Sequence, residues 1–363
     1  MNHWILLIAP FITALIIASV IIPAWIQLCT KWHLFDKPDS RKHHQTVIPS
    51  MGGIGIFISI MVSYLLFGYT INSQEQFNGI FAALLILFIT GFFDDLTDLK
   101  ARLKLVIQIL AAFMVAASGL RIHTLNGFAG IYELNLFWQY AISIFIMLFL
   151  VNAYNFIDGL DGLAATLGLI IFTMFAMLFY LHGQLNYAVL CVGVIGSMVS
   201  FLYFNFSPAR IFMGDTGSLV VGFLIGICTV KLFNLWFESP IISFGPSLTF
   251  ATIFILLFDL TRVVFIRISN GISPFKADRS HLHHMICRQQ FGHRGGAFIM
   301  ASFNIFFILL VLPFSHLRFM TFVVFSFCMA IALMNSKVMS FAATVRNKLM
   351  GTPVPKVGTD RTV

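Results

Sequence analysis

Long apolar segments alternate with short polar segments along almost the whole chain. Eleven apolar runs approach the roughly 20 residues that a membrane-crossing helix needs. They cover residues 4–28, 51–70, 78–93, 104–121, 134–154, 163–182, 186–204, 217–236, 244–266, 297–315 and 318–336. The pattern is weakest at 236–250 and at 316–317. We therefore predict an all-α, polytopic membrane protein with about eleven transmembrane helices.

The composition agrees with this pattern. Of the 363 residues, 59% are hydrophobic and 10% are charged, whereas soluble domains carry about 25% charged residues. The net charge of +8 raises the alternative of nucleic-acid binding. The basic residues lie in short loops between apolar runs, however, so we expect a lipid bilayer and no nucleic acid as partner. One transmembrane domain is predicted over 1–337, followed by a polar cytoplasmic tail over 338–363.

The charged residues are distributed unequally between the two sides of the membrane. Alternate loops on one side, together with the C-terminal tail, hold 19 of the 22 Lys and Arg residues, and such a side is normally cytoplasmic. The N-terminus is then expected in the periplasm and the C-terminus in the cytoplasm. All eleven Asp residues fall on or near the inner side, and all three Glu residues fall on the outer side. This separation indicates a cytoplasmic site built from short carboxylates.

The first polar motif, DDLTDLKARLK, covers residues 94–104 at the end of the third apolar run. Adjacent carboxylates repel each other and lose hydration energy near a membrane, so Asp94 and Asp95 require a cation or a wet surface. On a continuous helix Asp94 and Asp98 would share a face, with Lys104 further along. A solvated helix end is one interpretation, but paired Asp residues favour a site for a divalent cation or a phosphate.

The second motif, NAYNFIDGLDGLA, covers residues 152–164 between two apolar runs. Asn152, Asn155, Asp158 and Asp161 recur at every third position and form a polar stripe that drifts slowly around a helix. A turn rich in Asx and Gly residues would explain the glycines but not four amide and carboxylate groups in register. Ionisable groups at membrane depth are functional candidates, so we favour a functional stripe.

Two further motifs lie on the same predicted side. FMGDTGS, residues 212–218, presents Asp215 at an expected helix start, where it could be an N-cap or lie beside a phosphate. Together with the other Asp residues it is a candidate magnesium ligand. SPFKADRSHLHHM, residues 273–285, contains Arg279, His281, His283 and His284. The H-x-H-H spacing is not a zinc pattern, so we favour diphosphate binding over a basic loop that faces the membrane.

These side chains favour one class of chemistry. Carboxylate and amide oxygens are typical ligands of Mg²⁺ or Mn²⁺, and Mg²⁺ is often held by one or two protein groups together with substrate phosphates. The site therefore predicts an enzyme that transfers a phosphoryl group, with a lipid as one substrate. The competing class is an ion-coupled transporter, whose polar groups would lie near the middle of broken spans. Here they lie at span ends, which disfavours transport.

The four motifs occur in the order found in polyprenyl-phosphate N-acetylhexosamine-1-phosphate transferases, that is, glycosyltransferase family 4. The chain resembles this family from about residue 30 to residue 295. Its opening, DKPDSRKHH followed by a Gly pair at 52–53, and its H-x-H-H loop are most similar to the bacterial members that use undecaprenyl phosphate and N-acetylglucosamine.

The resemblance implies transfer of GlcNAc-1-phosphate from UDP-GlcNAc to undecaprenyl phosphate, with release of UMP, at the cytoplasmic face of the bacterial inner membrane. It implies Mg²⁺, with Mn²⁺ as an alternative, and a place at the start of O-antigen or common-antigen polysaccharide synthesis. Another UDP-N-acetylhexosamine donor stays open, as does a homodimer. By position, the residues implied are Asp215 and Asn155 as metal ligands, Asp94, Asp95, Asp158 and Asp161 as catalytic groups, and Lys104, Asn152, Arg279, His281, His283 and His284 as substrate-binding groups.

Overall fold

The computed structural model describes residues 3–32, 48–68, 74–128, 130–238, 241–271, 273, 281–286 and 292–333. The basic segment 36–47, Arg279 of the histidine loop and the predicted tail 338–363 lie outside these residues, and the predictions made for them stay untested.

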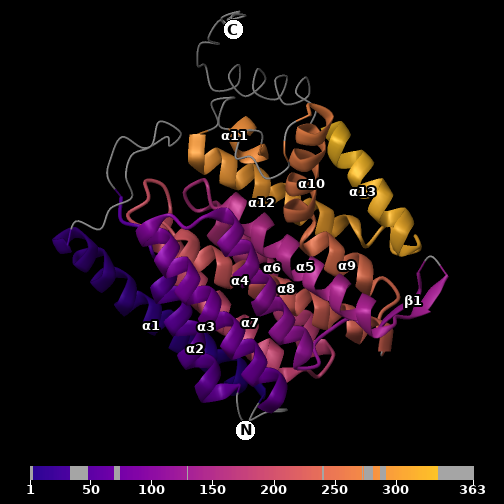
Figure 1. Cartoon of the computed structure of the whole chain (residues 1–363), viewed down its shortest axis with the longest axis horizontal. Coiled ribbons are helices and arrows are strands. Elements are labelled where there is room, and N and C mark those ends of the chain that lie inside the picture. Colours follow the sequence, from indigo (N-terminus) through magenta and orange to yellow (C-terminus); the bar gives the residue numbers. More distant parts are fainter. Residues whose placement is uncertain are drawn as a thin grey trace, which may run out of the picture.

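Thirteen helices and one β-hairpin make up the described part of the chain (Figure 1). The helices are α1 (His3–Trp32), α2 (Gly53–Phe67), α3 (Gln74–Thr97), α4 (Ala101–Ala117), α5 (Leu136–Ile157), α6 (Leu163–Leu181), α7 (Leu185–Asn205), α8 (Gly214–Glu238), α9 (Gly245–Thr252), α10 (Phe254–Ser269), α11 (Leu282–Ile286), α12 (Gly292–Leu310) and α13 (Phe319–Leu333). The strands β1 (Thr124–Phe128) and β2 (Ile131–Glu133) pair antiparallel.

Every predicted apolar run contains a helix, which confirms an all-α polytopic membrane protein. Seven helices within the described ranges are long and apolar enough to cross a membrane, or eight if the bent pair α9–α10 is one span. The apolar helices α2 and α13 are shorter, and α4 has 17 residues. Eleven crossings and the sides of the two termini therefore stay predictions.

The run predicted as one span over 244–266 is broken. Helices α9 and α10 meet at Ile253 with a bend of 64°. The side chain of Asn304 in α12 is fully buried and lies at this break. Its Nδ2 donates to the carbonyl of Thr252 (3.1 Å), and its Oδ1 accepts from the N–H of Ile255 (3.4 Å). Because a break frees backbone groups that cannot reach water inside a membrane, Asn304 compensates for the interruption.

The sequence did not predict the hairpin β1–β2, because its short, polar segment lacks a clear alternation of apolar residues. The hairpin connects α4 to α5, and Figure 1 shows it projecting from the bundle. Two hydrogen bonds hold its base. The N–H of Leu134 donates to the carbonyl of His123 (3.0 Å), and the N–H of Ile122 donates to the hydroxyl of Ser143 (2.8 Å).

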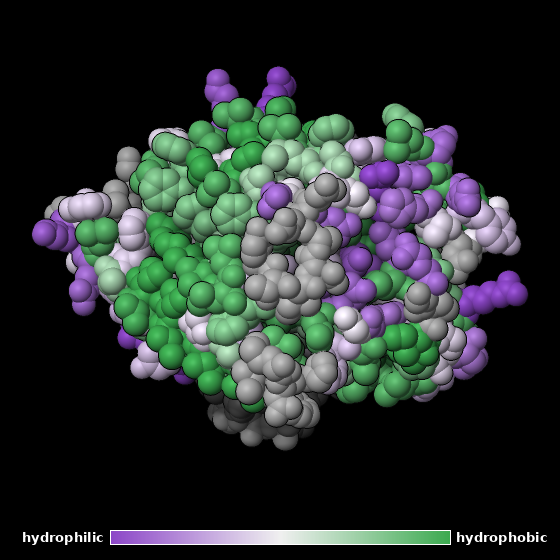
Figure 2. Space-filling view, turned by 90° about the horizontal axis from the view of Figure 1, so that it is seen from below, coloured by the Kyte–Doolittle hydropathy of each residue, from purple (hydrophilic) through white to green (hydrophobic). Residues whose placement is uncertain are grey.

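Helix α8 is the central helix. In its most apolar stretch 89% of the residues are buried, whereas in that of α1 only 22% of the residues are buried. On α1 the residues Ile8, Ile12, Ile16 and Val20 are 45–64% exposed. Their spacing of four places them on one face, as expected for a face that contacts lipid. Figure 2 looks at the lower end of the molecule in Figure 1 and shows broad hydrophobic areas with polar residues gathered to one side.

Two distant glycine-rich segments pair beside the start of α8. The N–H of Phe212 donates to the carbonyl of Pro49, and the N–H of Gly52 donates back to Phe212, both at 2.9 Å. A Cβ on Gly53 would lie 2.1 Å from the backbone nitrogen of Gly217, so any larger residue would separate α2 from α8. The glycine pair at 52–53 therefore supports the FMGDTGS turn, a contact that the sequence did not indicate.

Candidate active site

Four helix ends meet at one end of the bundle. They bring together the first, second and third motifs. The site lies where α3 ends, α4 begins, α5 ends and α8 begins. The Nζ of Lys104 in α4 lies 3.0 Å from Oδ2 of Asp94 in α3 and 3.1 Å from Oδ2 of Asp215 in α8. The structure thus places one ammonium between two carboxylates from helices more than a hundred residues apart in sequence.

Asn155 in the last turn of α5 completes this cluster. Its Nδ2 donates to Oδ1 of Asp215 (2.9 Å) and to the hydroxyl of Ser218 (2.7 Å). Asp215 and Asn155 are therefore close enough to act on one ion, and their function as metal ligands stays a prediction. We name Asp94, Lys104, Asn155 and Asp215 the carboxylate–lysine cluster.

Asp95 is the neighbour of Asp94 but makes different contacts in the structure. Its carboxylate accepts from the backbone N–H groups of Asp215 (2.8 Å) and Thr216 (3.0 Å) and from the Thr216 hydroxyl (2.5 Å). A carboxylate at this position caps the helix and interacts favourably with its dipole. Asp95 therefore holds the start of α8 and occupies the N–H groups that a phosphate would bind there, while its catalytic role stays a prediction.

The site contains more acidic than basic side chains. Asp158 follows directly after α5; its burial raises the pKa of its carboxyl well above the usual range, and the nearby carboxylates of Asp215 and Asp95 raise this pKa further. Lys104 is the cation that the described residues place between Asp94 and Asp215. With Asp94, Asp95, Asp158 and Asp215 near one ammonium, ionising every carboxyl group is unfavourable, so a bound divalent cation would stabilise their charged forms.

The predicted polar stripe of the second motif does not stay on one face, because α5 ends at Ile157. The Nδ2 of Asn152 donates to Gln108 in α4 (2.9 Å) and to the carbonyl of Leu148 (2.8 Å). Asp161 is buried and accepts from the N–H of Ala209 (3.2 Å), and it lies 3.1 Å from Nδ1 of His293. Asn152 thus connects α4 and α5, and Asp161 connects the loop after α5 to the loop before α8 and to the first turn of α12.

Asp98 also differs from the expectation. It lies beyond the end of α3 with a left-handed backbone (φ 55°) and is exposed. It therefore does not share a helical face with Asp94.

The histidine loop is anchored by an Asp residue that was not predicted as part of the site. His281 Nδ1 lies 2.9 Å from Oδ2 of Asp259 in α10, and the N–H of Leu282 donates to Oδ1 of the same carboxylate (2.8 Å). His281 and Asp259 are both almost fully buried, and His283 is buried against Gly159. Their contact places the loop beside the segment that carries Asp158.

Asp259 gives the first testable prediction. Replacement Asp259→Ala leaves the His281 ring and the Leu282 N–H without this acceptor, and we expect the protein to lose about 2–4 kcal/mol of stability. Asp259→Asn retains a carbonyl oxygen and should lose less. Thermal unfolding of the detergent-solubilised variants measures both effects. Equal midpoints for Asp259→Ala and the wild type would show that this anchor does not hold the loop.

Several residues of the site were not singled out from the sequence. Gln108 and His293 carry no local signal, because one lies in an apolar run and the other lies beyond the histidine motif. Asp259 did carry a signal, since an Asp inside an apolar run requires a partner. The pairing of Ser218 and Thr216 with Asn155 and Asp95 depends on how the helices are placed together.

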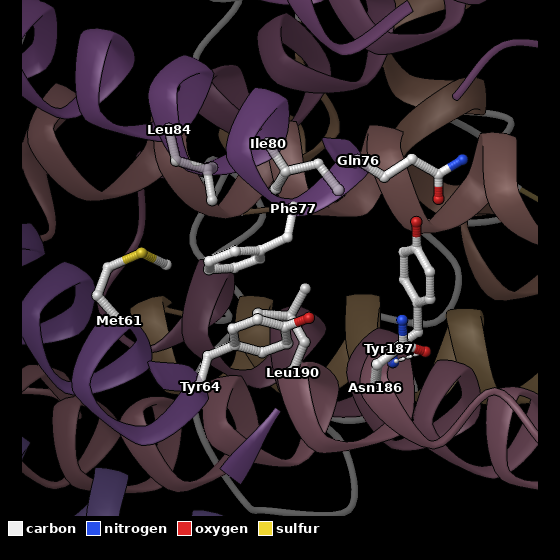
Figure 3. A pocket seen from close by; sticks show the side chains of 9 residues that line it. All are labelled: Met61, Tyr64, Gln76, Phe77, Ile80, Leu84, Asn186, Tyr187 and Leu190. Atoms are coloured by element: carbon white, nitrogen blue, oxygen red, sulfur yellow. Dashed lines mark hydrogen bonds between the residues drawn. The ribbon is translucent and has the colours of Figure 1, made fainter. Parts of the chain in front are cut away.

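An enclosed pocket lies at the opposite end of the bundle (Figure 3). It is lined by Tyr64 and Phe77, whose rings stack at 4.5 Å, and by Tyr187 near the start of α7. Phe77 lies in the first turn of α3 and Asp94 lies in its last turn, so the pocket and the carboxylate–lysine cluster are at opposite ends of this helix. The pocket volume of about 20 Å³ holds about one water molecule, so it is too small for a nucleotide or a lipid.

The cluster suits Mg²⁺ by its chemistry. Its donors are carboxylate and amide oxygens, which Mg²⁺ prefers. Within the described ranges, no three His, Cys, Asp or Glu side chains are close enough to hold a metal ion by themselves. An ion held here would therefore need ligands from substrate or water in addition to Asp215 and Asn155, as Mg²⁺ commonly does.

The fold and the cluster define a polytopic membrane protein whose polar site suits charged, phosphate-bearing substrates. The sequence profile of glycosyl transferase family 4 matches residues 77–233, a range that includes the carboxylate–lysine cluster. A Bacillus subtilis (strain 168) protein named "Probable undecaprenyl-phosphate N-acetylglucosaminyl 1-phosphate transferase" is 32% identical over 301 residues, which cover 81% of this chain and 80% of the relative.

Proteins named "Undecaprenyl-phosphate alpha-N-acetylglucosaminyl 1-phosphate transferase" are similar too. The one from Yersinia pestis is 30% identical and the one from Escherichia coli (strain K12) is 29% identical, each over 282 residues that cover 76% of this chain and 75% of the relative. The chain belongs to glycosyl transferase family 4, which confirms the resemblance found in its motifs.

Proposed function

We propose that this protein transfers GlcNAc-1-phosphate from UDP-GlcNAc to undecaprenyl phosphate, releasing UMP and forming GlcNAc-diphosphate-undecaprenol. The reaction would take place at the cytoplasmic face of the bacterial inner membrane and start the synthesis of O-antigen or common-antigen polysaccharides. The names of the relatives support the acceptor and the sugar. The distribution of Lys and Arg supports the cytoplasmic face.

One observation carries this proposal: Asp94, Lys104, Asn155 and Asp215 come from four helices and converge within hydrogen-bond distance at the ends of these helices. Such a site can bind a charged diphosphate, while the acceptor lipid approaches it from the adjacent bilayer. Phosphoryl transfer depends mostly on positioning and charge neutralisation, and this arrangement provides both.

The groups of the cluster have distinct proposed functions. Asp215 and Asn155 would hold Mg²⁺ or Mn²⁺. When bound, the ion would supply neutralisation of the diphosphate charge. Lys104 binds phosphate oxygens, and Asp94 orients its ammonium through the contact at 3.0 Å. An oxygen of the acceptor phosphate attacks the β-phosphorus of UDP-GlcNAc; the bond from that phosphorus to the bridging oxygen breaks, and UMP leaves with the electron pair.

Asp94 is proposed to position Lys104 rather than to accept a proton. Both of its oxygens are engaged, Oδ1 by the N–H of Leu99 (2.8 Å) and Oδ2 by Lys104. A phosphate monoester has its second pKa near 6, so the acceptor is already mostly a dianion at neutral pH and needs no base.

This assignment gives the second prediction. We expect Asp94→Asn to lower kcat by about 10²-fold, because Lys104 loses the carboxylate that orients it, and by the same factor across the pH range from 7.5 to 9. Initial rates of UMP release at saturating substrates measure the effect. A defect that disappears at high pH would instead identify Asp94 as a general base.

The experiment that tests the proposed function uses the purified protein, Mg²⁺ and undecaprenyl phosphate with a panel of UDP-sugars. We expect UMP release with UDP-GlcNAc, little release with UDP-GalNAc or a UDP-diacetamido sugar, and none without the lipid or in excess EDTA. Release with a different N-acetylhexosamine would keep the reaction but change the donor. If no UDP-sugar releases UMP in the presence of the lipid, the proposed function is wrong.

A further inference from the structure

An open groove is lined by the first turns of α6 and the last turns of α7, at the same end of the bundle as the carboxylate–lysine cluster. Its apolar walls come from Leu169 on α6 and from Val199, Leu202, Tyr203 and Phe206 on or just after α7, and it ends at Arg210. The Tyr203 side chain is 71% exposed and that of Phe206 is 48% exposed. A groove with this composition fits an acyl chain and not a polar ligand.

Two arginines contact the segment that lines this groove. The Arg210 guanidinium donates to the carbonyl of Tyr203 (3.3 Å) and lies 5.1 Å from the centre of its ring. Nε of Arg294, which comes from α12, donates to the carbonyl of Ser207 (2.8 Å), and its guanidinium lies 5.7 Å from the Phe206 ring. Both side chains are exposed, so they have N–H groups left for a ligand, and guanidinium groups are well suited to phosphate.

The segment that carries these groups is held in place before any ligand binds. The Asn205 side chain accepts from the N–H of Gly162 and donates to the carbonyl of Ile211, both at 2.8 Å. The buried carboxylate of Asp161 accepts from the N–H of Ala209 (3.2 Å). A fixed segment loses little conformational freedom when it binds a ligand, which favours a specific site over a general lipid-facing surface.

We propose that this groove binds one anionic phospholipid of the bilayer, with an acyl chain between α6 and α7 and the headgroup phosphate on Arg210 and Arg294. The charge of the arginines selects an anionic headgroup, and their place at the helix ends matches the depth of phosphates in a membrane. Lys104 lies on α4, which packs against α3 and α5. The groove is lined by residues of α6, α7 and the segment after α7, whereas Lys104 and its partners come from α3, α4, α5 and α8, so this proposal does not depend on the catalytic one.

Native mass spectrometry of the full chain released from detergent tests the proposal with phosphatidylglycerol and phosphatidylcholine of identical acyl chains. We expect one phosphatidylglycerol to be retained per chain and phosphatidylcholine to be retained at least about 10-fold more weakly. The double variant Arg210→Gln, Arg294→Gln should weaken retention of phosphatidylglycerol by about 10- to 30-fold. Arg102→Gln removes an exposed arginine at the start of α4 and should have no effect.

A second variant and a competition experiment separate the remaining explanations. Val199→Trp fills the groove and keeps both arginines, and we expect it to lose phosphatidylglycerol as well. The proposal is overturned if the two lipids are retained equally, if the double variant retains phosphatidylglycerol as the wild type does, or if Val199→Trp has no effect. It is also overturned if undecaprenyl phosphate displaces phosphatidylglycerol from the wild type at equal concentration, because the groove would then belong to the acceptor.

Discussion

Replacement Asp215→Asn is expected to lower kcat by about 10³-fold while the protein stays folded. The substitution retains the size of the side chain and its contact with Asn155, but it removes a charge that both Lys104 and a bound cation need. Loss of one preorganised electrostatic group in an active site typically lowers the rate by about 10²–10³-fold, and this position is proposed to serve two cations. UMP release by purified protein at saturating substrates and Mg²⁺ measures the change.

The matched control is Asp98→Asn, which removes an exposed carboxylate from the same end of the bundle. We expect its rate to stay within about twofold of the wild type, since an exposed charge is screened by water and salt. Size-exclusion profiles and melting midpoints should show that both variants fold. Equal rates for Asp215→Asn and Asp98→Asn would exclude Asp215 from the reaction.

Replacement Gly91→Ala is expected to lower both stability and activity strongly. A Cβ on Gly91 would lie 2.5 Å from the carbonyl oxygen of Asp215, which is backbone and cannot rotate away. Helix α3 must then move from the start of α8, so Asp95 loses its capping bonds and Asp94 moves away from Asp215. We expect a loss of about 2–3 kcal/mol from this overpacking, measured as a lower thermal midpoint, together with loss of UMP release.

A Gly→Ala replacement within a helix normally stabilises a protein by about 1 kcal/mol. A loss of stability in Gly91→Ala would therefore indicate a clash between helices. Gly193→Ala in α7 is a suitable control, since its Cβ would meet only the side chain of Ser63, with the hydroxyl oxygen at 3.1 Å. We expect this control to change stability by less than about 1 kcal/mol. A Gly91→Ala protein as stable as the control would show that α3 and α8 are not in close contact at Gly91.

The sequence predicted the candidate site better than it predicted what each residue does there. Asp94, Lys104, Asn155 and Asp215 were identified because carboxylates, amides and lysine are unusual at the ends of apolar runs. Asp94 and Asp95 looked equivalent as a pair of adjacent carboxylates. In the structure Asp94 binds Lys104, whereas Asp95 binds the backbone of α8. This difference depends on the direction in which each side chain leaves α3 and on which helix lies there.

The dependence on contacts between distant segments also explains the other differences between the predicted and the observed structure. The predicted stripe from Asn152 to Asp161 assumes a continuous helix, and the turn at Asp158–Gly162 directs Asp161 towards His293 instead. The break between α9 and α10 could not be predicted from an apolar run, because the side chain that satisfies its backbone groups, Asn304, lies some fifty residues later. Asp259 looked like one of many inner Asp residues until the fold brought it to His281.

The sequence by itself determined that this chain forms apolar helices for a membrane and that its short carboxylates gather at one end of them, because hydrophobic period and charge position are local properties. Only the tertiary structure decided which carboxylate meets Lys104, which one caps α8, and where α2 and α8 approach closely enough to require glycine. Those outcomes depend on contacts between helices that lie far apart along the chain, and the free energy of such contacts is set by packing and not by the sequence of any one segment.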